Sequence, residues 1–242
     1  MSACGGDDRP AAPQPAPDRP APLAELPDRI DAAPAAPERD APLRDTTSLI
    51  EVWRARDVDG WKHTFDERAD DRQEAGVALH WLAVRGDTIV CRIVGTDDAG
   101  LADLAAAEAR AGALAAAGDA KRVDQWLVRD RGAVDLPEPG DGAVDTVVAV
   151  YEVDDVDAWQ AAFDAAADWP GLGVVATLVA QDRADPRRAV VQFAARDGAA
   201  LADALQTRAV RSAMKNAGVR RRPKVVAAAT IELSAYRPTY RR

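Results

Sequence analysis

The sequence predicts an α+β protein in which two units with the same element order pack sheet to sheet. Three observations lead to this prediction. One line of sequence occurs twice, because VDGWKHTFDERAD begins at Val58 and VDAWQAAFDAAAD begins at Val156. The same succession of strand-like and helix-like patterns surrounds each copy. The strand-like segments are apolar on both faces, so each sheet requires a covering layer on either side.

The matches between the two copies keep nearly constant offsets. The matching positions are Asp57/Asp155, Val58/Val156, Asp59/Asp157, Trp61/Trp159, Phe65/Phe163, Asp66/Asp164, residues 101–103/201–203 and residues 117–118/217–218. Matches that persist over such a length indicate an internal duplication. We therefore divide the chain into repeats at 46–130 and 145–234, joined by a linker rich in Pro and Gly at 131–144.

The first repeat opens with a strand and a helix. Residues 48–56 are rich in branched and aromatic side chains, which predicts a strand. Val58, Trp61 and Phe65 then fall on one stripe of a helix, and Asp57 is placed to cap its first turn. The remaining patterns predict a hairpin of strands at 77–84 and 88–95, a helix at 99–116 that Gly118 stops, and a strand at 121–130.

The second repeat has the same order. Its predicted elements are a strand at 144–153, a helix at 156–168, strands at 173–181 and 189–196, a helix at 198–216 and a strand at 224–233. Strand, helix, strand, strand, helix, strand is the ferredoxin-like arrangement. Its two helices cover only one face of the sheet, yet the last strand is apolar on both faces. We therefore expect the two sheets to face each other, with the helices outside.

Two such units closing sheet to sheet resemble the dimeric α+β barrel superfamily, here as a fused tandem pseudo-dimer. The resemblance spans both repeats and rests on the line D-V-D-x-W-x-x-x-F-D and on AMKNAGVRRRP at 213–223. That superfamily includes antibiotic-biosynthesis monooxygenase-like and stress-responsive proteins. The matching residues are helix-packing residues, so they indicate a fold and carry little chemistry.

Composition narrows the range of partners. Apolar residues make up 48% of the 242, which is enough for a core. The net charge of −9 and the pI near 4.8 argue against nucleic acid, because phosphates need clustered cations. We interpret the cluster at 220–222 with Lys224 as a solvated turn, with a phosphate site as the alternative, and the basic tail at 235–242 as a frayed end. No apolar run is long enough to span a membrane.

Residues 1–45 are expected to form a disordered tether rich in Pro and Ala, since they hold ten of the sixteen prolines. Met-Ser-Ala-Cys-Gly-Gly at the start resembles the end of a bacterial lipoprotein signal. The resemblance implies a lipid on Cys4, with the lipid as the membrane contact and the cell envelope as the location. The alternative is a cytoplasmic protein with a flexible tail.

Motifs of chemistry are few. Neither histidine, His63 nor His80, has a second ligand at metal spacing, and no HExxH, CxxC, GxSxG or glycine-rich phosphate loop occurs. We expect no metal and no cofactor, and we interpret the repeated Trp and Phe residues as core, the repeated Asp residues as helix caps and Cys91 as a buried thiol. One weak ligand-binding set remains, namely Glu51, Trp53, His80, Arg92, Tyr151 and Gln192.

Two interpretations of this set are open. If their faces point between the sheets, Glu51, Trp53, Arg92, Tyr151 and Gln192 line a pocket with polar groups and aromatic walls. Otherwise, Glu51 and Arg92 form an ion pair that only fixes packing.

We expect a monomer that is non-catalytic or binds a small apolar or aromatic ligand. The alternative is an enzyme like the antibiotic-biosynthesis monooxygenases, acting on an aromatic or quinone-like molecule between a sheet and its helices. An interaction module would instead require a large exposed apolar patch or an open sheet edge.

Overall fold

The computed structural model describes residues 46–132, 144–166 and 168–235. The predicted tether with Cys4, linker residues 133–143 and the tail from 236 onward lie outside the described residues.

The N-terminal half contains β1 to β4 and has the predicted order. Its elements are β1 (Thr47–Ala55), α1 (Val58–Glu67), α2 (Ala69–Glu74), β2 (Val77–Arg85), β3 (Thr88–Gly95), α3 (Asp98–Ala106), α4 (Glu108–Ala117) and β4 (Ala120–Asp130). The cap is where the sequence places it, because the Asp57 carboxylate accepts a hydrogen bond from the Gly60 amide at 2.8 Å.

The C-terminal half contains β5 to β8 in the same order. Its elements are β5 (Asp145–Glu152), α5 (Val156–Ala166), the short 3₁₀ helix η1 (Pro170–Leu172), β6 (Val174–Asp182), β7 (Arg188–Ala195), α6 (Gly198–Leu205), α7 (Arg208–Asn216) and β8 (Lys224–Ala235). Asp155 caps α5 by accepting from the Ala158 amide at 2.7 Å.

The prediction of one unbroken helix at 99–116, and of another at 198–216, is wrong in detail. Ala107 adopts an extended conformation (φ −68°, ψ 90°) that separates α3 from α4. Thr207 is extended as well, and its hydroxyl accepts a hydrogen bond from the Val210 amide to start α7. Alanine favours helix, but this local preference is weak and does not keep either segment in one unbroken helix.

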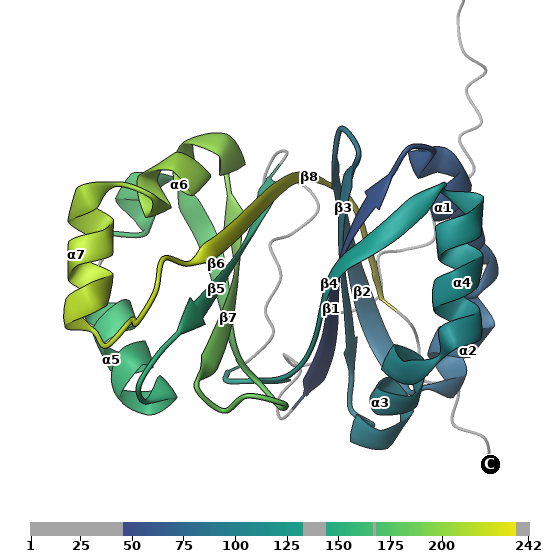
Figure 1. Cartoon of the computed structure of the whole chain (residues 1–242), viewed down its shortest axis with the longest axis horizontal. Helices are drawn as coiled ribbons and strands as arrows, with labels where there is room; N and C mark the ends of the chain where they lie inside the picture. Colours follow the sequence, from purple (N-terminus) through teal and green to yellow (C-terminus); the bar gives the residue numbers. More distant parts are fainter. Residues whose placement is uncertain (1–45, 133–143, 167, 236–242) are drawn as a thin grey trace, which may run out of the picture. The chain divides into compact units, whose positions relative to one another are not determined.

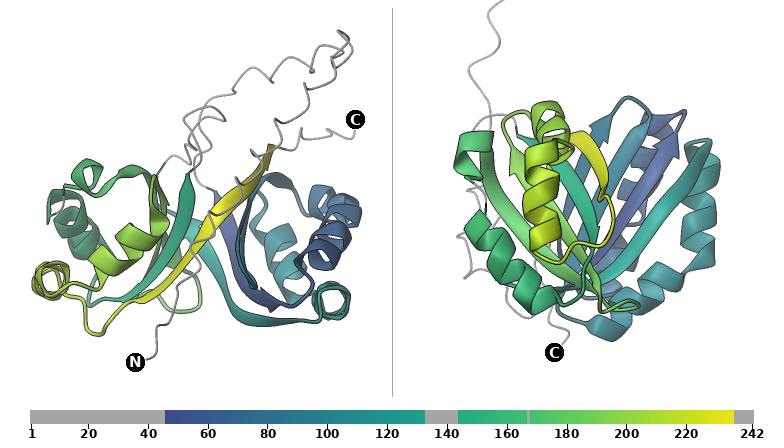
Figure 2. Two further views of the ribbon diagram at one scale, coloured as in Figure 1. Left: turned by 90° about the horizontal axis from the view of Figure 1, so that it is seen from above. Right: turned by 60° about the vertical axis from the view of Figure 1, so that its left-hand side comes forward.

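The eight strands close into one barrel in the order β1-β3-β2-β8-β5-β7-β6-β4. One seam between the halves joins β2 to β8, and Figure 2 shows β8 crossing from the C-terminal half to reach it. The other seam pairs only residues 128–130 of β4 with 180–182 of β6. The two sheets face each other with helices on the outside (Figure 1), which confirms the predicted fold class.

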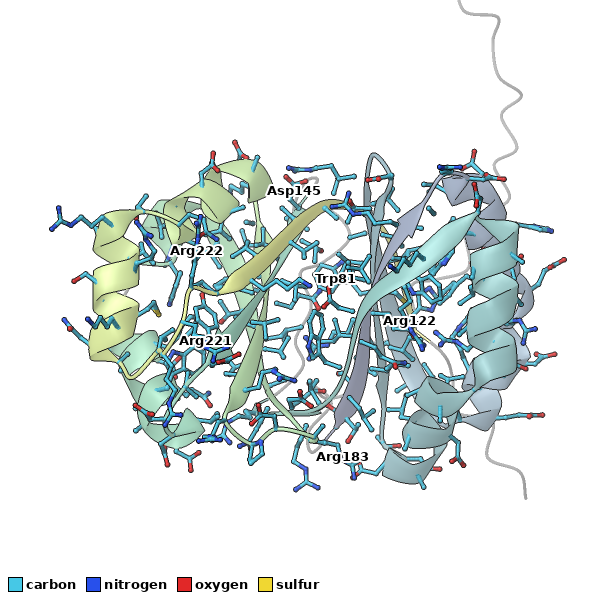
Figure 3. The ribbon with its side chains drawn as sticks, viewed as in Figure 1. Trp81, Arg122, Asp145, Arg183, Arg221 and Arg222 are labelled. Carbon is cyan, nitrogen blue, oxygen red and sulfur yellow. The ribbon has the colours of Figure 1, made fainter. Side chains whose placement is uncertain are left out.

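Three cores follow from this arrangement. One lies between sheet and helices in each half, around Trp61 and Phe65 or around Trp159 and Phe163. The third lies inside the barrel, where Ile50, Val52, Trp81, Val90, Trp126, Val148, Val190 and Ala228 are buried. Figure 3 shows Trp81 between the two sheets. β1 and β3 are buried on both faces along almost their whole length, as predicted. The last strand, β8, is less buried than predicted, because residues 225–229 are only partly buried apart from Ala228.

Ion pairs also tie the halves together. Lys224 at the start of β8 pairs with Asp124 of β4, and Arg85 of β2 pairs with Asp145 of β5 at 3.0 Å. These pairs are partly exposed, so each contributes little to stability by itself. No helix in the described part of the chain is long and apolar enough to cross a membrane.

Candidate functional site

Each half has an aromatic layer between its sheet and its helices. In the N-terminal half, the ring of Trp53 from β1 lies 5.9 Å from that of Trp61 on α1. In the C-terminal half, Tyr151 from β5 lies 5.2 Å from Trp159 on α5. Phe65 and Phe163 extend the two layers, at 5.2 Å and 4.9 Å from the neighbouring indole. The equivalent positions of the halves thus carry equivalent rings, as the core interpretation requires.

These aromatic layers contain polar atoms without partners. The Tyr151 hydroxyl and the indole N–H groups of Trp53, Trp61 and Trp159 are buried, and none has a hydrogen-bond partner among the described residues. Burial raises the pKa of Tyr151, so the hydroxyl stays protonated and can donate. An unsatisfied buried donor costs about 1–3 kcal/mol. Each half therefore contains two hydrogen-bond donors, at matching positions, whose burial lowers the stability of the fold.

A second cluster surrounds Glu51, on the helix-facing side of β1. Glu51 is completely buried and accepts two hydrogen bonds from Arg110 of α4, at 3.1 and 2.5 Å. Arg122 and Gln125 of β4 each donate to it at 3.2 Å. Figure 3 shows Arg122 beside β4. Cys91 is the β3 neighbour of Glu51 in the sheet and is also buried, as predicted.

The charges in the Glu51 cluster compensate one another. Burial by itself would raise the pKa of the Glu51 carboxyl, but the charges and hydrogen bonds of Arg110 and Arg122 outweigh burial and lower that pKa below its usual range. Burial likewise opposes the charge on Arg110, and Glu51 reverses this by raising its pKa. The carboxylate is fully committed to neighbouring side chains, which is typical of a structural ion pair.

The C-terminal half lacks this cluster. Its residues at the positions of Glu51 and Arg110 are Ala149 and Val210, both of which pack against apolar neighbours. The same fold therefore forms with apolar residues at the equivalent positions. The Glu51 cluster is specific to the N-terminal half.

A third cluster lies inside the barrel, around Arg92 and Asp130. Arg92, 1% exposed, donates to Asp130 at 2.5 Å, to Ser48 at 3.1 Å and to Gln192 of the other half at 3.3 Å. Asp130 also accepts from the hydroxyls of Thr46 and Ser48 at 2.6 and 2.7 Å. Arg92 and Asp130 border a hollow of about 110 Å³, which has room for roughly three to four water molecules. This polar cluster connects the two halves through Arg92 and Gln192.

The predicted ligand-binding set does not come together as expected. Arg92 and Gln192 meet inside the barrel, whereas Glu51, Trp53 and Tyr151 lie on the helix-facing sides of their sheets. The reason is strand register: Arg92 is the β3 partner of Ile50, so it shares the barrel face with Ile50 and not with Glu51. The prediction of one shared pocket is therefore wrong. The alternative Glu51–Arg92 pair is wrong too, because both residues have other ionic partners.

The two histidines lie apart. His80 of β2 is buried, with its ring 5.1 Å from that of Phe65, so it belongs to the N-terminal aromatic layer. His63 is exposed on α1, with its Nε2 atom 3.1 Å from a carboxylate oxygen of Glu67. Within residues 46–132, 144–166 and 168–235, no group of three or more His, Cys, Asp or Glu side chains is placed to hold a metal ion.

Sequence reasoning missed Arg110 and Asp130, the two charged partners that organise these clusters. Both could have been found from spacing. Asp130 has the same parity as Trp126 and Val128 along β4, so it faces the apolar barrel interior. Arg110 lies four residues before Leu114, on the buried stripe of α4.

Comparisons with known proteins agree with the fold. No family model matches this chain, and no curated protein matches it. Three similar solved structures are an anthrone oxidase-like protein, a candidate monooxygenase of Fusobacterium nucleatum subsp. nucleatum and a candidate chlorite dismutase. Their identities are 15%, 10% and 12%, with TM-scores of 0.53, 0.51 and 0.54. The matches cover 79%, 79% and 78% of this chain and 93%, 95% and 96% of the other chains. The chain therefore has the dimeric α+β barrel fold, formed within one polypeptide.

Proposed function

We propose that this chain is a non-catalytic protein that binds a small aromatic molecule bearing carbonyl or hydroxyl oxygens, within the aromatic layer of one half. The observation that carries the proposal is the pair of buried donors without partners, Tyr151 and Trp159, repeated as Trp53 and Trp61. A planar ring with oxygen acceptors matches both the aromatic walls and the free donors.

The C-terminal layer is the better candidate for the site. The N-terminal layer adjoins the buried Glu51 and Arg110 charges, whereas the C-terminal layer is bordered by apolar side chains such as Val191 and Phe193. A phenolic hydroxyl can also both donate and accept, which an indole N–H cannot do. The layer is closed in this structure, so ligand entry requires α5 to move away from β5.

Titration of the full chain with anthraquinone tests this proposal. We expect saturable quenching of tryptophan fluorescence, with an affinity up to about tenfold weaker for Tyr151→Phe, because one hydrogen bond is worth roughly 1.4 kcal/mol or less. Trp53→Phe tests whether the ligand binds in the aromatic layer of the N-terminal half instead. Thr177→Val removes an exposed hydroxyl from the C-terminal half and serves as the control. Equal affinity for Tyr151→Phe and the control would refute a role for the phenol.

A second candidate function is oxidation of such a molecule. The similarity to an anthrone oxidase-like protein and to a candidate monooxygenase favours this activity, and the same free donors could hold an aromatic ketone. Oxygen uptake by the protein in the presence of anthrone separates the two functions. Saturable binding with no uptake above the uncatalysed rate supports the binding function. Uptake that increases with protein concentration, and that Tyr151→Phe reduces, supports the enzyme.

We also propose that Cys4 carries a lipid that holds the protein at the cell envelope, and that the chain is otherwise a monomer. Feeding cells a labelled lipid precursor tests the first point, since a full-length protein without label contradicts it. Light scattering of the purified chain tests the second.

A further inference from the structure

A hollow of about 240 Å³ lies on the C-terminal half, between α7 and the segment that leads into β8. Leu205 of α6 and Met214 of α7, both almost fully buried, form part of its lining, together with Val219. The hollow is separate from the aromatic donors, which it does not include. An apolar floor of this kind suits the body of a small organic molecule.

The hollow exists because the chain takes a longer path in this half. In the N-terminal half, residues 118–119 alone connect α4 to β4, whereas residues 217–223 connect α7 to β8. Gly218 turns the chain with φ +87°, a conformation that favours glycine, and Val219 then bridges to Val153 beside β5. The extra residues form a rim around the hollow instead of closing directly onto the sheet.

The rim is strongly cationic. Arg211 and Lys215 contribute from α7, and Arg220, Arg221 and Arg222 contribute from the connecting segment. Figure 3 shows Arg221 and Arg222 on this side of the C-terminal half. These five cations line one hollow in a chain whose net charge is −9.

Carboxylates compensate only part of this charge. Arg220 pairs with Asp154, and Arg221 lies 3.3 Å from Glu152. In the described part of the chain, Arg211, Lys215 and Arg222 have no ion-pair partner. Arg222 donates to the Gln206 side chain and Arg211 to the Thr207 carbonyl, both of which are uncharged. Three like charges around one apolar floor repel one another unless an anion lies between them.

We propose that this hollow binds a small organic carboxylate, with its apolar body on Met214 and Leu205 and its charge among Arg211, Lys215 and Arg222. Guanidinium groups bind carboxylates through paired hydrogen bonds, and the ammonium adds a point charge. The volume equals about eight water molecules and is smaller than a drug-sized site, so the ligand is compact. The site is independent of the aromatic layers and of the function proposed for them.

The chain offers a direct probe of this site. It contains two methionines, Met1 and Met214, and only Met214 lies at the hollow. In full-length protein labelled with ¹³C at the methionine methyl groups, titration with sodium benzoate at constant ionic strength is expected to shift the Met214 signal saturably. Benzyl alcohol tests the need for the charge, and inorganic phosphate tests the need for the apolar body.

The charge is tested with the double variant Lys215→Glu/Arg222→Glu. The control, Arg56→Glu/Lys121→Glu, makes the same change in net charge at exposed positions of the N-terminal half. We expect the test variant to bind benzoate at least tenfold more weakly and the control to bind it as the unmodified chain does. The proposal is overturned if benzoate leaves the Met214 signal unmoved, if benzyl alcohol or phosphate binds as tightly as benzoate, or if both variants lose the same affinity.

Discussion

The buried Glu51–Arg110 pair allows a quantitative test, because the C-terminal half has Ala149 and Val210 at the same positions. The perturbations are Glu51→Leu and Arg110→Met, singly and together. The Glu51 side chain is 0% exposed and that of Arg110 is 3% exposed, so either single substitution leaves a charge buried without its main partner. We expect each to lower the free energy of unfolding by about 3–5 kcal/mol, whereas the double variant should lie within about 1 kcal/mol of the unmodified chain.

The assay is urea unfolding of all four proteins monitored by circular dichroism, which gives the free energy of unfolding of each. A double-mutant cycle gives the interaction energy between Glu51 and Arg110 directly. Single effects below about 1 kcal/mol, or a double variant as unstable as the sum of the singles, would refute the argument that the pair is committed to structure.

The same pair predicts a pH dependence. The folded-state pKa of Glu51 lies below its unfolded value of about 4.3, so its contribution to stability is present above pH 4.3 and is lost as the pH falls through the folded-state pKa. The unmodified chain should therefore lose stability relative to the Glu51→Leu/Arg110→Met variant only below about pH 4. A stability difference between these two proteins that stays constant from pH 7 to pH 3 would contradict the lowered pKa.

Three further predictions concern other sites. Arg92→Met leaves Asp130 buried without its cation, so it should lower the free energy of unfolding in urea by about 3–5 kcal/mol. The control Arg54→Met breaks an exposed ion pair and should lower it by under about 1 kcal/mol. Similar losses for the two variants would be inconsistent with a buried Arg92–Asp130 pair. Tyr151→Phe removes a buried hydroxyl without a partner, so in the absence of ligand the chain should become about 1 kcal/mol more stable, and a lower melting temperature would reveal a hidden acceptor. Gly112 lies in α4 with open space around it, so Gly112→Ala should stabilise the chain by about 0.5–1 kcal/mol. Gly218 has a positive φ, so Gly218→Ala should destabilise the chain. A melting temperature for Gly218→Ala equal to or above that of Gly112→Ala would contradict this prediction.

Much of the fold could be predicted from local signals. Trp61 and Phe65 share one helical stripe, and Asp57 caps the helix that carries them, so the position of α1 follows from spacing. The break at Ala107 could not be predicted in this way, because the alanine-rich segment around it favours an unbroken helix. Thr207 did offer a local signal, since threonine is a preferred residue at the start of a helix.

The candidate site was harder to predict. Side chains alternate between the two faces of a strand, and this correctly puts Glu51 and Trp53 on one face. Alternation does not say whether that face is turned toward the barrel interior or toward the helices. The sequence therefore left Glu51 on either the barrel side or the helix side. Its partner Arg110 is 59 residues away, on a helix whose rotation depends on the packing of the whole half.

The sequence alone determined the order of the elements, their repetition in the two halves and the need for two covering layers on each sheet. It could do so because hydrophobic periodicity and apolar content are properties of short stretches of sequence. Tertiary structure alone decided which face of each strand is turned toward the barrel, and therefore separated Arg92 and Gln192 from Glu51, Trp53 and Tyr151. It also decided that the longer connection before β8 surrounds a cationic hollow. The physical reason is that facing, pairing and open space depend on residues distant in sequence, which meet only when the two halves close the barrel.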